Sequence, residues 1–73
     1  MSTLYLITIM REGIEYWSQY GGFSPNRGTA KEYSWSAASM HLRNLHSIAK
    51  HDEEHRYYAD AQMEPVVREE VVV

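Results

Sequence analysis

The stretch LYLITIMREGIEYW, residues 4–17, decides the fold. Two runs rich in β-branched and aromatic residues, 4–10 and 14–19, flank the short turn Arg11-Glu12-Gly13. This pattern predicts a β-hairpin over residues 3–20, with Gly13 supplying a positive φ in the turn. Residues 4–10 carry apolar side chains on both faces, such as Leu6 on one and Ile7 on the other, which is typical of an inner strand.

A helix is expected from about residue 36 to residue 49, where apolar residues recur at helical spacing. Ser34 or Ser36 can cap its first amides. Arg43 falls on the side opposite the apolar stripe. The stripe is narrow and suits one face of a small sheet; it consists of Ala38, Leu42, Leu45 and Ala49.

The remaining segments are shorter and more polar. Gly21-Gly22 ends the second strand, residues 23–28 read as a loop, and 29–33 as either a short third strand or an extended segment. We expect a short helix over 52–58 capped by Asp52. We also expect a last strand over 62–69, in which Pro65 indicates a sheet edge, the start of the strand or a bulge. The predicted chain is one α+β domain, residues 1–69, followed by a frayed tail, 70–73. In this domain the N-terminal hairpin and the C-terminal strand form a small antiparallel sheet. One main helix packs on one face of that sheet, and the returning strand makes residues 4–10 central.

Composition narrows the classes of function. The chain has 73 residues, no cysteine and a net charge of −3. A core of this size buries only about 60% of the unfolded chain's surface, which leaves little room for a deep catalytic pocket. Neither a disulfide framework nor a thiolate zinc site is possible. The N-terminus lacks signal-peptide features and its apolar run is too short to span a bilayer, so we expect a cytoplasmic protein without a membrane segment. The acidic balance argues against autonomous nucleic-acid binding.

No motif for catalysis or cofactor binding is evident. His51 and His55 have the spacing of two ligands on one helix face, but HDEEH departs from the HExxH zinc pattern at Asp52 and lacks a good third ligand. The adjacent carboxylates of residues 52–54 suit a helix N-terminus better than a catalytic pair. We therefore expect no enzyme, no cofactor and no metal; a metal enzyme built on the two histidines is the minor alternative, tested by zinc titration.

The aromatic residues carry the strongest functional signal. EYWSQYGGF, residues 15–23, holds four rings and two glycines. Nine rings exceed what so small a core buries, so about half are expected in the core and the rest partly exposed. Strand alternation sends Tyr16 and Trp17 to opposite faces, one seating the helix and the other outside, while Gly21-Gly22 presents Phe23 on a loop. A protein interface is favoured over base stacking, because stacking sites normally line a basic groove. The predicted partner-binding residues are Tyr5, Arg11, Trp17, Tyr20, Phe23, Trp35, Arg43 and Tyr57.

Three segments, LYLITIM (4–10), EYWSQYGGF (15–23) and YSWSAASMHLRNL (33–45), resemble the small RNA-polymerase-binding transcription regulators of phages, specifically one from a Xanthomonas-infecting bacteriophage. The resemblance covers most of the chain. It implies a monomer in the host cytoplasm that binds RNA polymerase near the N-terminus of the β′ subunit and the β flap. Such a protein inhibits initiation by interfering with the σ factor and suppresses termination, with a NusA-type elongation factor as a further partner.

Two other classes remain open. One is a phage inhibitor of another host system, a CRISPR effector or a nuclease, acting by protein–protein binding. Charge reversal at residues 52–54 separates it from a polymerase binder, because a nucleic-acid mimic depends on its carboxylates. The other is an accessory domain with no activity of its own.

Overall fold

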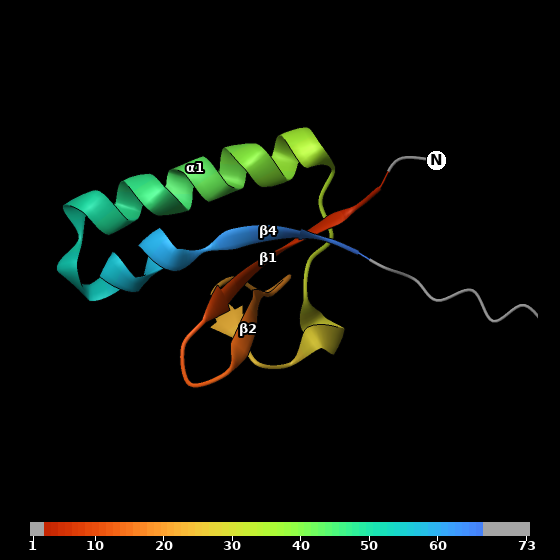
Figure 1. Cartoon of the computed structure of the whole chain (residues 1–73), viewed down its shortest axis with the longest axis horizontal. Helices are drawn as coiled ribbons and strands as arrows, with labels where there is room; N and C mark the ends of the chain where they lie inside the picture. Colours follow the sequence, from red (N-terminus) through yellow and green to blue (C-terminus); the bar gives the residue numbers. More distant parts are fainter. Residues whose placement is uncertain (1–2, 67–73) are drawn as a thin grey trace, which may run out of the picture.

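Four antiparallel strands and one long helix form the protein in a computed structural model that describes residues 3–66 (Figure 1). The fold is therefore the expected small α+β arrangement. The sheet has the strand order β3-β2-β1-β4. In chain order the elements are β1 (Tyr5–Met10), β2 (Ile14–Trp17), β3 (Phe23–Ser24), the 3-10 helix η1 (Arg27–Thr29), α1 (Trp35–His51), the 3-10 helix η2 (Glu53–Asp60) and β4 (Gln62–Pro65).

β1 is the central strand, as its two apolar faces predict. Thr8 pairs with Tyr16 of β2 on one side and with Gln62 of β4 on the other. The four middle residues of β1, 6–9, are all buried. Pro65 lies on the edge strand β4, where its missing N–H costs no inner ladder bond, so this prediction is confirmed.

α1 begins at a side-chain cap and ends at a residue whose side chain caps the next helix. The Ser34 Oγ accepts a hydrogen bond from the Ala37 N–H at 3.3 Å, which satisfies one of the amides that the first turn leaves unpaired. Asp52 terminates the helix: its own N–H donates to the Ile48 carbonyl, while its Oδ1 accepts from the Glu54 N–H at 3.0 Å. The same residue thus starts η2, as expected, although this second helix is 3-10 and extends to residue 60.

The core lies between the sheet and the two C-terminal helices. α1 runs along one side of β1 and β4, as Figure 1 shows. Ile7 from β1 and Leu45 from α1 are the largest fully buried side chains. They pack with Ala49, Tyr58 and Ala61, so η2 closes one end of the core.

The turns differ from the expectation. Gly13 does not take a positive φ. The turn is closed instead by a hydrogen bond of 3.0 Å from the Arg11 N–H to the Gly13 carbonyl. Within residues 3–66, positive φ occurs at Gly21 (86°) and Gly22 (77°). These two left-handed residues reverse the chain so tightly that Phe23 pairs directly with Trp17. Phe23 therefore begins β3, and the prediction that it stands on a loop is wrong.

The segment after β3 follows the second of the two alternatives. Thr29 ends η1, and residues 30–33 are an extended connection held by isolated bridges, Ala30 to Ser18 and Tyr33 to Tyr5. The strand predicted over 62–69 is formed over Gln62–Pro65. Its last part, 67–69, and the expected tail, 70–73, lie outside the described residues.

Candidate protein-binding surface

Four of the eight predicted partner-binding residues belong to one connected set of ring contacts, which we call the aromatic edge: Arg11, Trp17, Phe23 and Tyr57. Trp17 meets Phe23 edge-on with ring centroids 5.2 Å apart. The buried ring of Tyr58 joins the two halves, 5.5 Å from Phe23 and 4.8 Å from Tyr57. Arg11 lies over the Tyr57 ring, 4.3 Å from its centroid.

Sheet register and η2 together build this surface. Trp17 alternates with Tyr16, so it lies on the helix-facing side of β2, and its partner Phe23 lies on the same side. η2, in the C-terminal third of the chain, places Tyr57 and Tyr58 next to these rings. Trp17, Phe23 and Tyr57 are half-buried and packed against the core. Their rings are consequently held in place yet still reach the surface.

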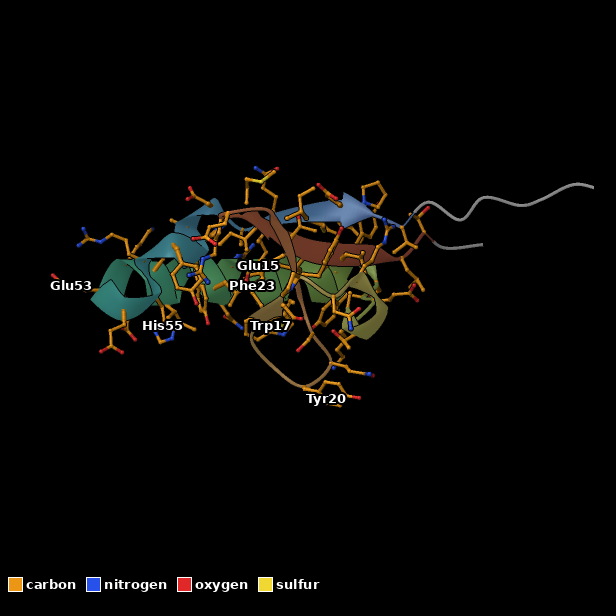
Figure 2. The ribbon with its side chains drawn as sticks, turned by 90° about the horizontal axis from the view of Figure 1, so that it is seen from below. Glu15, Trp17, Tyr20, Phe23, Glu53 and His55 are labelled. Carbon is orange, nitrogen blue, oxygen red and sulfur yellow. The ribbon has the colours of Figure 1, made fainter. Side chains whose placement is uncertain are left out.

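Charged side chains border the aromatic edge. Arg11 also forms an ion pair with Glu15 at 3.8 Å, which adds a carboxylate on the same side of β2 as Trp17. His55 Nδ1 lies 2.7 Å from the Asp52 carboxylate. In Figure 2, Glu15, Phe23 and Trp17 are labelled close together near the centre of the molecule, and His55 lies to their left. Tyr20 lies at the end of a projecting turn. Exposed pairs of this kind add little stability.

The other four predicted residues are not brought to this surface. Tyr5 is half-buried at the start of β1, where its backbone exchanges hydrogen bonds with Tyr33. Tyr20 is 81% exposed on the turn after β2. Trp35, 59% exposed, and Arg43 both belong to α1 and take no part in the ring contacts of the aromatic edge given above.

The expectation for the adjacent rings Tyr16 and Trp17 is confirmed. Trp17 turns toward the helix and touches His41 and Tyr58, with centroid distances of 4.8 and 6.1 Å. Tyr16 lies on the other face of the sheet, with the Arg27 guanidinium 5.9 Å from its ring centroid. The ring that seats the helix is therefore Trp17, and it contributes to the aromatic edge only through its accessible side.

Sequence reasoning missed three residues of this region. Glu15 lies two residues before Trp17, so strand alternation alone places it on the same face. His55 lies three residues after Asp52, a spacing that indicates a local side-chain hydrogen bond. His41 lies beside the apolar stripe of α1, but nothing in the sequence indicates that its ring stacks on Tyr33, with centroids 5.5 Å apart.

Burial shifts the pKa values of two groups in this region, and a hydrogen bond shifts that of a third. The pKa of His41 is lowered by burial and by the nearby charge of Lys31, and its Nε2 has no hydrogen-bond partner. Burial raises the pKa of Tyr58, which keeps the phenol neutral. The hydrogen bond from His55 lowers the pKa of Asp52, so this carboxylate stays ionised next to the rim.

The arrangement offers contacts rather than a metal-binding geometry. Across residues 3–66, no three His, Cys, Asp or Glu side chains gather closely enough to hold a metal ion. His55, one of the two spaced histidines, is engaged with Asp52 through Nδ1. What the aromatic edge presents is a set of ordered rings with one cation stacked on them.

Comparison with known proteins adds no relative: no family model, no curated protein and no solved structure matches this chain. In the part of the chain that the structure describes, neither length nor apolarity allows any helix to cross a bilayer.

Proposed function

We propose that this chain is a phage-encoded transcription regulator that binds host bacterial RNA polymerase through the aromatic edge. Two observations support the proposal. The three segments that resemble the polymerase-binding regulators contain β1, most of β2, the first residue of β3 and residues 35–45 of α1. The single observation that carries the binding mode is the half-buried ring set of Trp17, Phe23 and Tyr57 with Arg11 stacked on it.

Pre-ordered rings favour binding. A side chain fixed by the core loses little further conformational freedom when a partner covers it, and that loss is about 0.5–1.5 kcal/mol for a mobile side chain. Aromatic and arginine side chains are also the types that dominate binding energy at protein interfaces. Tyr57 and Arg11 are already held against each other before any partner arrives.

Occupancy of a polymerase surface accounts for both proposed activities. Near the β′ N-terminus and the β flap, the bound protein hinders the σ factor and so lowers initiation at host promoters. Retained on the elongating enzyme, it suppresses termination, with a NusA-type factor assisting. Inhibition of this kind needs only mutually exclusive binding, or preference for a polymerase conformation that binds σ poorly, and no catalytic group in this chain.

The test compares two arginines that each lie over a tyrosine ring. Arg11→Ala removes the cation over Tyr57, whereas Arg27→Ala removes the one near Tyr16 on the opposite sheet face. We expect wild type to retain polymerase of the proper host in a pull-down, to inhibit promoter-directed transcription and to increase terminator read-through. Arg11→Ala weakens binding at least about tenfold, equivalent to about 1.4 kcal/mol, and Arg27→Ala leaves it unchanged. Absence of wild-type binding at micromolar concentration ends the proposal.

An inhibitor of a CRISPR effector or nuclease remains the alternative outcome. Nucleic-acid mimicry requires a row of free carboxylates, yet Asp52 caps η2 and pairs with His55. Reversing the charges of Glu53 and Glu54, with Asp52 kept as the cap of η2, separates the two functions: a mimic loses its activity, while a polymerase binder that uses the aromatic edge keeps it.

A further inference from the structure

α1 carries an unusual distribution of charge for an acidic protein. Its 17 residues contain no Asp or Glu, whereas Arg43 and Lys50 are both present. The chain has seven Lys and Arg and ten Asp and Glu in total, so the remainder holds five cations against all ten carboxylates. Lys50 in the last turn is accounted for by the helix dipole. The helix dipole does not account for Arg43 in the middle of the helix, or for the absence of Asp and Glu from α1.

These cations lie along a shallow, open groove on the flank of α1, lined by residues of this helix alone. The groove has a volume of about 530 Å³, with Leu42 contributing an apolar side chain, Ser39 and Ser47 contributing hydroxyls, and Arg43 and Lys50 contributing charge. His46 also borders it, and its Nε2 donates a hydrogen bond to the Ala61 carbonyl at 3.0 Å, which fixes that wall. We call this the basic groove.

The cations of the basic groove have no counter-charge in the fold. Among residues 3–66 the Arg ion pairs join Arg11 to Glu15 and Arg56 to Glu53, and neither Arg43 nor Lys50 takes part in one. No carboxylate lines the groove. Helical spacing places Trp35 on the same flank, four residues before Ser39, and this ring is 59% exposed.

We propose that the basic groove binds an acidic segment of a partner protein, in an extended conformation and with an apolar side chain directed toward Trp35 and Leu42. Arg43 and Lys50 are seven residues apart, or about 10 Å along the helix. An extended chain rises about 3.3 Å per residue and only its alternate side chains share a face. Carboxylates four residues apart, about 13 Å, can therefore both face the helix, within reach of the long Arg43 and Lys50 side chains. Arg43 offers a fork of donors suited to a carboxylate.

Charge favours a protein segment over a nucleic acid. Affinity for a polyanion grows with the number of phosphates neutralised, and the groove contains two permanent cations. The rest of the chain is net negative, five cations against ten carboxylates, and repels an extended polyanion. A short acidic segment with one apolar residue uses the cations, the hydroxyls and the exposed tryptophan without approaching those carboxylates. This inference stands apart from the polymerase proposal, because it concerns a different face of the molecule.

The test measures anisotropy of a fluorescein-labelled synthetic peptide. The peptide carries two glutamates four residues apart and a leucine two residues ahead of the first, so that all three side chains share one face of the extended chain. A control peptide has glutamine in place of glutamate. The double variant Arg43→Glu with Lys50→Glu is matched by Arg27→Glu with Arg56→Glu, which changes the net charge equally. Arg56 is exposed, with 76% of its side chain accessible, so this control leaves the groove intact.

We expect saturable binding of the glutamate peptide, weakened at least about tenfold by the groove double variant and retained in the matched control. The proposal is overturned if the peptide does not bind, if the glutamine peptide binds equally, or if both double variants lose binding alike. Tighter binding of a short single-stranded oligonucleotide at the same salt concentration also overturns it. All four substituted side chains lie outside the core, so we expect each variant to keep its helix content. Circular dichroism of each variant checks this.

Discussion

The two tryptophans provide a direct test of how the fold uses its aromatic rings. The same substitution, Trp→Ala, is made at Trp17 and at Trp35. Trp17 packs against the core and contacts three rings, those of Phe23, His41 and Tyr58. Trp35 begins α1 and is 59% exposed.

We expect the two substitutions to lower the free energy of unfolding by amounts that differ several-fold. Replacing a fully buried aromatic residue with alanine costs about 3–5 kcal/mol. Trp17 is only half-buried, which lowers this figure, but its three edge contacts each add about 0.5–1.5 kcal/mol beyond burial. We expect a loss of about 3 kcal/mol for Trp17→Ala and less than about 0.5 kcal/mol for Trp35→Ala.

Urea unfolding followed by circular dichroism at the helix band measures both variants. A domain of this size has a free energy of unfolding of roughly 3–5 kcal/mol, so Trp17→Ala is expected to be largely unfolded or to unfold at very low urea. Trp35→Ala keeps the wild-type midpoint. Equal midpoints for the two variants would refute the assignment of Trp17 to the core-facing side of the hairpin.

Three further predictions follow from the caps, the turns and the buried histidine. Ser34→Ala removes the cap of α1 and lowers the free energy of unfolding by about 1 kcal/mol, while Ser36→Ala, one residue beyond the first helical position, has little effect; urea midpoints distinguish them. Gly22→Ala destabilises the fold by about 1 kcal/mol, because φ is 77° there, whereas Gly13→Ala is tolerated, which contradicts the turn predicted from sequence. Burial lowers the pKa of His41, so the unfolded chain binds that proton more readily; stability is full above the ordinary imidazole pKa of about 6.5 and falls as pH drops through it. His41→Phe removes this pH dependence, and thermal melts between neutral pH and about pH 5 decide the point.

The sheet and helix were predictable because their signals are local. The two apolar faces of residues 6–9 identify β1 as central, and serine before an apolar stripe identifies the start of α1 within a residue. Pro65 likewise identifies the edge strand. In each case one residue type satisfies a requirement of backbone geometry or burial that the neighbouring sequence makes plain.

The turns and the site were less predictable because they depend on distant contacts. Glycine at 13 and glycines at 21 and 22 look alike in sequence, and only the pairing of Phe23 with Trp17 determines which of them turn left-handed. The aromatic edge joins the hairpin to η2, more than thirty residues later along the chain. Composition indicated a surplus of rings, but it did not indicate that Tyr57 and Arg11 meet.

The central claim is that the aromatic edge is the surface that polymerase covers. Hydrogen–deuterium exchange of the chain, alone and bound to host RNA polymerase, tests it most directly. Our account predicts slower exchange in β2 and η2, the elements that carry Trp17 and Tyr57, with less change along the exposed side of α1. Protection confined to α1, or none in β2 and η2 when the polymerase is saturating, would contradict it.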